Sequence, residues 1–275
     1  MSVPTTPTPR VVKLPGGVEL SITEYGDAEA DKGTGVLVLH GGAGPRTVAG
    51  LAAALSQHAY VIAPVHPGFD GTPRPEQFDS VADLASTYLD LLDVLGLSSV
   101  MVIGSSIGGW IAAEMATRDN KKVVAATVLV NAPGIKADPG QEITDVSTLT
   151  PVEMGKLAFH NPQFRLDPST LTEQQRAGMI ANQGTLAVYA GEHMYDVKLR
   201  GRLHRVDIPV LVVWGEEDGV VPLAYGRTFA DSFARARFVQ IPETGHFPFI
   251  EDPAAFFGAL GEFISTDVKP GENDD

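Results

Sequence analysis

A serine flanked by glycines, set between an apolar run and a helix-like run, is the feature that most constrains this chain. Residues 100–103 predict a buried strand, residues 110–115 predict a helix, and GSSIGG lies between them. A strand that turns straight into a helix strains its turn residue, and glycines two residues away on either side let the backbone pass close by. Such a turn exposes the serine hydroxyl and directs the following amide toward the group it attacks. Ser106 is therefore a candidate nucleophile, and Ile107 a candidate oxyanion donor.

Apolar runs and helix-like runs alternate on both sides of this turn. The clearest helix, residues 81–95, has apolar side chains at three- and four-residue steps, with Ser80 and Asp83 as its cap and Gly96 at its end. Continuous apolar runs are typical of parallel strands that are buried on both faces. They occur at residues 36–39, 60–63, 100–103, 123–130, 210–214 and 236–241. The alternation predicts an α/β fold, with a mainly parallel sheet covered by helices on both faces. Two β-prone runs before it, residues 10–14 and 18–25, predict a hairpin.

The alternation breaks between residues 135 and 206. That interval has no strong strand pattern and holds helix-like pieces, such as residues 151–159 and 172–181. Because sheet-type sequence lies on both sides, we interpret it as a helical cap inserted into one domain. The predicted core is then residues 11–134 and 207–265, with flexible tails at residues 1–10 and 266–275.

The composition argues against two classes of partner, nucleic acid and anionic membranes. The 275 residues carry 34 acidic and 20 basic side chains, a net charge of −14, which repels nucleic acid and anionic membranes. There is no apolar run of the roughly 20 residues that a membrane helix needs, and the first residues lack the apolar region of a secretory signal. We therefore expect a cytoplasmic protein that acts on a small molecule. The sequence leaves a homodimer open.

A serine hydroxyl needs a base to take its proton, and that base needs an orienting carboxylate. The loop after residues 210–214 supplies Glu216, Glu217 and Asp218, and the loop after residues 236–241 supplies His246. Both loops follow predicted parallel strands, at the sheet edge where such folds bind ligands. The order serine, acid, histidine is the order found in α/β-hydrolases. The chain has no cysteine and no H-E-x-x-H spacing, so we expect neither a metal site nor a cofactor.

Four segments in this order resemble the α/β-hydrolase superfamily with a cap. They are HGGAG at residue 40, GSSIGG at 104, GEEDGVVP at 215 and GHFPFIEDP at 245, and the resemblance covers roughly residues 11–264. It implies a mostly eight-stranded sheet and a triad of Ser106, Asp218 and His246. It also implies an oxyanion loop in which the Gly42 amide joins that of Ile107.

One loop departs from the family pattern. Relatives often read Gly-Phe-Gly-x-Ser where this chain has Gly68-Phe69-Asp70-Gly71-Thr72, and we expect Asp70 to keep the turn by adopting a left-handed backbone. Four histidines outside the triad have structural interpretations. His40 is expected to bond its own loop, and His58, His66 and His204 are expected at the surface or in loops.

The resemblance leaves several functions open. A serine nucleophile argues against haloalkane dehalogenases and epoxide hydrolases, whose resembling members use aspartate, and Ile107 replaces the tryptophan usual in proline iminopeptidases. A carboxylic-ester hydrolase is the favoured function. A C–C bond hydrolase of ring-cleavage products, a cofactor-free perhydrolase and a non-catalytic ligand-binding protein are the alternatives. The expected pocket residues are His40, Phe159, Met179, Tyr189, Met194 and Phe247. Three arginines of the interval, Arg165, Arg176 and Arg200, are the candidates for binding an acidic substrate.

Overall fold

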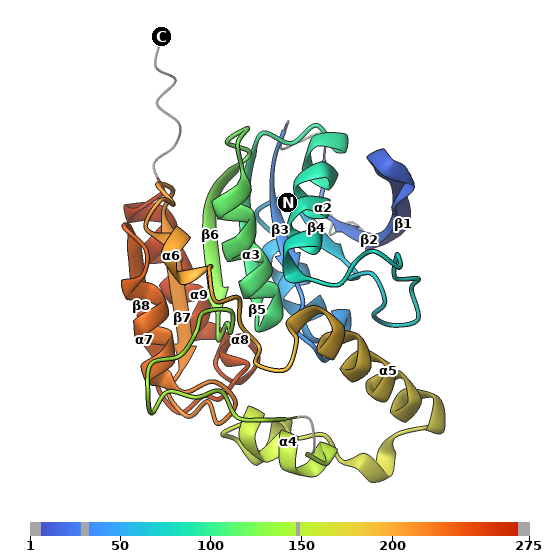
Figure 1. Ribbon diagram of the computed structural model, residues 1–275, viewed down its shortest axis with the longest axis vertical. Coiled ribbons are helices and arrows are strands. Elements are labelled where there is room, and N and C mark those ends of the chain that lie inside the picture. The colour runs from blue at the N-terminus through green and yellow to red at the C-terminus, as the bar shows by residue number, and fades with distance from the viewer. Residues whose placement is uncertain (1–6, 29–32, 147–148, 269–275) are drawn as a thin grey trace.

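An eight-stranded sheet forms the centre of the protein in the computed structural model, which describes residues 7–28, 33–146 and 149–268 (Figure 1). The strand order is β1-β2-β4-β3-β5-β6-β7-β8. β2 pairs antiparallel with both β1 and β4, and every other neighbouring pair is parallel. The strands are β1 (Thr8–Lys13), β2 (Glu19–Tyr25), β3 (Thr34–Leu39), β4 (Val61–Pro64), β5 (Ser99–Ser105), β6 (Val124–Val130), β7 (Val210–Gly215) and β8 (Ala236–Ile241). The predicted α/β fold class is confirmed.

Helices cover both faces of this sheet. Figure 1 shows α2 and α3 in front of the sheet and α9 behind it. The helices are α1 (Ala49–Leu55), α2 (Val81–Val94), α3 (Ile107–Arg118), α4 (Pro151–Ala158), α5 (Glu173–Ala190), α6 (Arg200–Leu203), α7 (Leu223–Asp231), α8 (Pro248–Glu251) and α9 (Pro253–Thr266). Short 3₁₀ turns are η1 (Pro15–Gly17), η2 (Pro45–Thr47), η3 (Pro162–Phe164) and η4 (Pro168–Thr170). The central strands need this cover because their side chains are apolar on both faces: every residue of β7 is buried.

The sequence patterns located most of these elements closely. α2 begins after Ser80, whose backbone amide donates to Asp83, and the two residues form the expected capping box. The apolar stripe of α2 lies against the core, with Leu84 and Leu91 fully buried. The helices α7 and α8 were not predicted from the sequence. Glycine in α7 hid its helical pattern, yet Gly226 is required there because a Cβ on it would lie 2.4 Å from the Trp214 ring.

The hairpin is confirmed, but its first strand begins at Thr8, inside the predicted tail of residues 1–10. Thr8 pairs with Glu24 across the hairpin, and the Arg10 guanidinium forms an ion pair with the same glutamate. These cross-strand contacts extend the strand beyond its apolar residues. The predicted tails at residues 1–6 and 269–275 lie outside the described residues.

The interval between β6 and β7 contains α4, α5, α6, η3 and η4. In its described part no strand forms, and its one β-bridge joins Gly134 to Tyr195. Figure 1 shows α4 and α5 beyond the lower edge of the sheet, the edge where β5 ends and α3 begins. α5 continues nine residues past the predicted end at 181, because its second half packs against the core and buries Asn182 and Tyr189.

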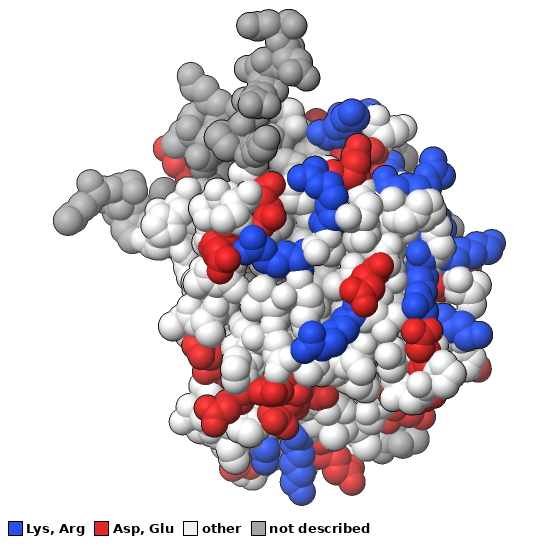
Figure 2. All heavy atoms as spheres, turned by 90° about the vertical axis from the view of Figure 1, so that its left-hand side faces the viewer, with Lys and Arg blue, Asp and Glu red and all other residues white. Residues whose placement is uncertain are grey.

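The surface mixes charges of both signs. Figure 2 shows the face over β8 and α7, where acidic and basic side chains alternate and no single sign dominates the whole face. Across the described ranges, no helix has both the length and the apolarity to cross a membrane.

Candidate active site

Ser106 lies in a strained turn between β5 and α3. Its backbone angles are φ 55° and ψ −124°, a conformation that non-glycine residues rarely adopt. The flanking glycines make the turn sterically feasible. A Cβ on Gly104 would lie 2.1 Å from the Gly108 carbonyl oxygen, and one on Gly108 would lie 2.3 Å from that of Leu39. The turn therefore has the local geometry predicted from GSSIGG.

Asp218 and His246 meet in a buried pair. Asp218 follows β7 and His246 follows β8, and His246 Nδ1 lies 2.8 Å from Asp218 Oδ2. The other carboxylate oxygen, Oδ1, accepts from the amides of Val220 and Val221 at 2.8 and 3.2 Å. The competing acids Glu216 and Glu217 are exposed. Of the three acids in this loop, Asp218 alone has its side chain fixed against the histidine.

Asn131 completes the surroundings of the carboxylate, and sequence reasoning missed this role. It follows β6, is fully buried, and donates from Nδ2 to Asp218 Oδ2 at 2.6 Å. Its own Oδ1 accepts from the amide of Gly215 at 3.3 Å. The available signal was position: Asn131 directly follows β6, the strand that neighbours β7.

The turn and the pair share one edge of the sheet. The Ser106 amide donates to the carbonyl of Val130, the residue before Asn131, at 2.9 Å. The sequence-distant residues 106, 131, 218 and 246 thus follow β5, β6, β7 and β8, which are consecutive neighbours in the sheet. Within the described residues the Ser106 hydroxyl has no hydrogen-bond partner, so it is free to bond an incoming group.

The loop after β3 lies against Ser106. A Cβ on Gly41 would sit 3.1 Å from the Ser106 Cβ and 3.8 Å from its Oγ. Over the described ranges, the backbone amides of Gly42 and Ile107 donate to no protein acceptor. One of these amides follows Ser106 and the other follows Gly41, which lies against Ser106. Unbonded amides are the kind of donor that an oxyanion requires.

A match to a family model identifies the family to which this chain belongs. Residues 36–259 match the model of the alpha/beta hydrolase family. The chain belongs to that family. It is 30% identical to an uncharacterised protein of Mycobacterium tuberculosis, over 89% of this chain and 79% of that protein.

Two further relatives have named activities. One is the 2-hydroxy-6-oxo-6-(2'-aminophenyl)hexa-2,4-dienoic acid hydrolase of Metapseudomonas resinovorans, 26% identical over 91% of this chain and 89% of that protein. The other is a pimeloyl-acyl-carrier-protein methyl ester esterase of Chromobacterium violaceum, 24% identical over 83% of this chain and 91% of that protein. The first is thus named as a hydrolase of a dienoic acid, and the second as an esterase of a methyl ester.

In this alpha/beta hydrolase, the interval between β6 and β7 is hydrogen-bonded to the loop that carries Asp218 and to the loop that carries His246. The Gly219 amide donates to the Leu157 carbonyl at 3.0 Å, and the His246 amide donates to the Ala158 carbonyl at 2.8 Å. Leu157 and Ala158 form the end of α4, so one helix end bonds both loops. Glu251 of α8 adds a third contact, because its Oε1 accepts from the Gly245 amide at 2.6 Å and its Oε2 accepts from the Asn161 amide of the interval at 2.7 Å. No sequence pattern indicated these contacts.

α5 lies across the neighbouring loops. The amide of Asp70 donates to Asn182 Oδ1 at 2.8 Å, and Asn182 Nδ2 donates to Asp70 Oδ1 at 3.1 Å. Asp70 has φ 48°, so the expected left-handed turn is confirmed, and its side chain gains a partner that glycine would lack. On the same helix face, Leu186 covers the loop after β3: a Cβ on Gly42 would lie 2.6 Å from Leu186 Cδ2.

The expected pocket residues separate into two groups. The first group lies beside the pair: the Phe247 ring is 5.2 Å from the rings of both His246 and Phe159, measured between centroids. Met194 and Met179 belong to neither group. Met194 is half-buried against the core. Met179 is 38% exposed on α5.

The second group has no surface left for a substrate. Tyr189 is buried and donates its hydroxyl to the Pro67 carbonyl at 3.0 Å. His40 is fully buried, and both of its ring nitrogens face backbone groups. The prediction that these two residues line the pocket is therefore wrong in this conformation.

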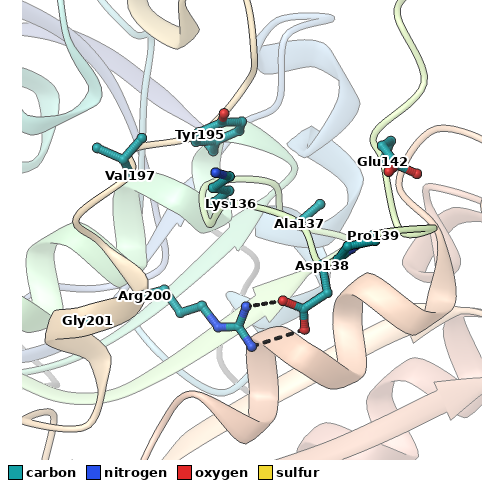
Figure 3. Close-up of a pocket in the computed structure, with 9 residues that line it drawn as sticks. All are labelled: Lys136, Ala137, Asp138, Pro139, Glu142, Tyr195, Val197, Arg200 and Gly201. Carbon is teal, nitrogen blue, oxygen red and sulfur yellow. Dashed lines mark hydrogen bonds and ion pairs between the residues drawn. The ribbon is translucent and has the colours of Figure 1, made fainter.

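A surface cavity of about 830 Å³ lies elsewhere, between the loop after β6 and the segment before α6 (Figure 3). Figure 3 shows the Arg200 guanidinium facing the Asp138 carboxylate, with two hydrogen bonds of 2.6 and 3.2 Å between them. Neither Ser106 nor His246 lines this cavity. Within the described ranges, no three His, Asp or Glu side chains are grouped so that they could hold a metal ion.

Proposed function

We propose that this enzyme is a serine hydrolase that cleaves a small to medium carboxylic ester through an acyl-enzyme. Ser106 is the nucleophile, His246 the base and Asp218 the acid that orients it. Residues 135–206 form the cap over this site. The observation that carries the proposal is the buried Asp218–His246 pair at the sheet edge where the strained Ser106 turn lies.

The proposed reaction first forms an acyl-enzyme on Ser106 and then hydrolyses it. Ser106 Oγ attacks the ester carbonyl carbon while His246 accepts its proton, and Asp218 stabilises the imidazolium that forms. The amides of Gly42 and Ile107 donate to the oxygen that becomes negative. His246 then protonates the departing alcohol, and water, activated by the same imidazole, releases the acid and restores the Ser106 hydroxyl.

The arginines of the interval favour an uncharged ester over an acidic substrate. The Arg165 guanidinium donates to the carbonyls of Phe159 and His160, and that of Arg176 donates to the Leu171 carbonyl. Arg200 is paired with Asp138. Arg200 is thus paired with a carboxylate, and the other two use guanidinium N–H groups on backbone carbonyls, which leaves fewer donors for a carboxylate substrate. The Chromobacterium relative, named as an esterase, supports the same class.

A C–C bond hydrolase of ring-cleavage products is the second candidate function. The Metapseudomonas relative acts on a dienoic acid by its name, and its match extends over nearly the whole chain. The same serine, histidine and oxyanion donors would serve that reaction, so the substrate must be distinguished by assay.

The deciding experiment compares a panel of p-nitrophenyl esters with a 2-hydroxy-6-oxo-dienoate on the wild type and Ser106→Ala. We expect ester turnover that falls by several powers of ten in the variant, on the order of 10⁶. Labelling with a fluorophosphonate gives an independent measure of the reactive serine. Ester turnover that survives in Ser106→Ala contradicts the nucleophile, and faster turnover of the dienoate contradicts the ester class.

A further inference from the structure

His40, His66 and Tyr88 form a buried cluster next to the oxyanion loop. His40 follows β3, His66 follows β4 and Tyr88 lies on α2, and none of the three has exposed surface. The two imidazoles are stacked with their centroids 3.7 Å apart. His66 lies in a loop, as expected, but its ring is wholly inside the protein and not at the surface.

The partners of each nitrogen assign the protons of His40. The His66 amide donates to His40 Nε2 at 3.0 Å, so that nitrogen carries no proton. His40 Nδ1 lies 2.7 Å from the Gly41 carbonyl oxygen and must be the donor there. Burial lowers the pKa of His40 to about 4, which keeps this single neutral tautomer at neutral pH.

The protons of His66 follow in the same way. Its Nε2 lies 2.9 Å from the His40 carbonyl oxygen and therefore donates to it. Its Nδ1 then accepts from the Tyr88 hydroxyl. Burial holds the pKa of His66 well below its ordinary value, so this ring is neutral too. Two hydrogen-bond paths thus run in the same direction. One leads from the Tyr88 hydroxyl through the His66 ring to the His40 carbonyl. The other leads from the His66 amide through the His40 ring to the Gly41 carbonyl.

The hydrogen bond from His40 to Gly41 fixes the Gly41–Gly42 peptide, which carries the N–H proposed to bind the oxyanion. The Gly41 carbonyl accepts from His40 Nδ1 and from the Gly44 amide at 3.1 Å. In a planar trans peptide the N–H points opposite to the C=O, so both bonds direct the Gly42 N–H away from His40. Glycine at both positions would otherwise let this peptide rotate freely.

We propose that His66 and Tyr88 are positioning residues for the Gly42 amide, acting through His40. This inference rests on the proposed function, in which that amide binds the oxyanion. A donor held in place before the reaction costs no reorganisation when negative charge develops on the substrate oxygen. Loosening it weakens binding of the transition state more than binding of the ester, so turnover falls and KM changes little.

Tyr88→Phe removes the hydroxyl that donates to His66, with the smallest change in packing. We expect kcat on p-nitrophenyl butyrate to fall roughly 10-fold at unchanged KM, against 10²–10³-fold for loss of a whole oxyanion donor. The rates are normalised to the sites labelled at completion by a fluorophosphonate, which removes misfolded protein from the comparison. Tyr60→Phe is the matched control, because it removes another buried tyrosine hydroxyl, one bonded to Glu24 at the hairpin.

A pair of variants at His66 separates positioning from bulk packing. Gln keeps a donor and an acceptor, and Leu keeps neither. We expect His66→Gln to retain more kcat than His66→Leu at equal labelled sites. Equal kcat in Gln, Leu and wild type, or a loss in Tyr88→Phe no larger than in Tyr60→Phe, overturns the proposal.

An NMR readout distinguishes this failure from failure of the proposed function. Imidazole ¹⁵N shifts should show His40 protonated on Nδ1 and His66 on Nε2. The Gly42 amide shift should change in Tyr88→Phe, while that of Ile107 stays fixed. If wild-type Ser106 neither labels nor turns over esters but the Gly42 shift moves, the esterase proposal fails and the positioning contact stands. An unmoved Gly42 shift contradicts the contact itself.

Discussion

Two buried histidine networks lie at the same edge of the sheet and differ in what they face. His246 faces the Asp218 carboxylate, which stabilises a positive imidazolium. The stacked pair of His40 and His66 faces carbonyls, an amide and a phenol, none of which carries charge. Burial is nearly complete in both networks, since His246 is 3% and His40 0% exposed.

The difference shows that the partner, not burial alone, decides what a buried histidine does. Beside a carboxylate, an imidazole can accept a proton during the reaction and return it. Beside neutral groups, desolvation keeps it neutral, and it serves as a hydrogen-bonding spacer of fixed direction. We therefore propose proton transfer for the first network and positioning for the second. The predictions below test that division.

Asp218→Asn should produce the largest effect, because it removes the charge that distinguishes the two networks. The imidazole of His246 loses its orienting acceptor, and we expect kcat to fall by roughly 10⁴. Steady-state kinetics on a p-nitrophenyl ester measure it. Glu217→Gln is the control on the same loop, since its side chain is exposed. Similar losses in both variants would show that the loop, rather than the carboxylate, matters.

Asn131→Gly should produce an intermediate effect. It removes the donor to Asp218 Oδ2, a hydrogen bond to a charged group that contributes about 1.5–3 kcal/mol, so we expect kcat/KM to fall roughly 10- to 100-fold. Glycine is chosen because Asn131 has φ 48°, where alanine would add strain. Lys122→Gly, at an exposed residue with φ 58°, is the matched control. Unchanged kinetics in Asn131→Gly would remove Asn131 from the site.

The stacked pair should make the fold sensitive to acid. The pKa of His40 is about 4 in the folded protein and near 6.5 when exposed, so the unfolded chain binds more protons between these values. The contribution is fully present above pH 6.5 and is lost as pH falls toward 4, by up to about 1.4 kcal/mol per unit. His66 acts in the same direction. Urea unfolding at pH 7.5, 6.5 and 5.5 measures the slope.

Variants locate the source of that slope. His66→Gln should reduce it, because one buried imidazole no longer has to charge. His204→Gln should leave it unchanged, because His204 is exposed. A free energy of unfolding that is flat from pH 7.5 to 5.5 in the wild type would contradict the neutral, buried state of both rings.

The sequence by itself determined the sheet, the Ser106 turn and the order of the site residues. Short continuous apolar runs are typical of buried parallel strands, and glycine at 104 is required by the Gly108 carbonyl within the turn itself. These features depend on residues close together in the chain, so their pattern is readable along it. The same holds for α2, whose cap and apolar stripe are local.

Only the tertiary structure decided which distant polar groups meet. Sequence reasoning assigned Asn131 no role, yet strand order places it against Asp218. His66 carried no local signal, and its role depends on β3 and β4 being neighbours that bring it onto His40. Asp70 broke a family pattern, and its partner Asn182 lies 112 residues away on α5. Hydrogen-bond partners depend on position in space, whereas periodicity and spacing record only what is near along the chain.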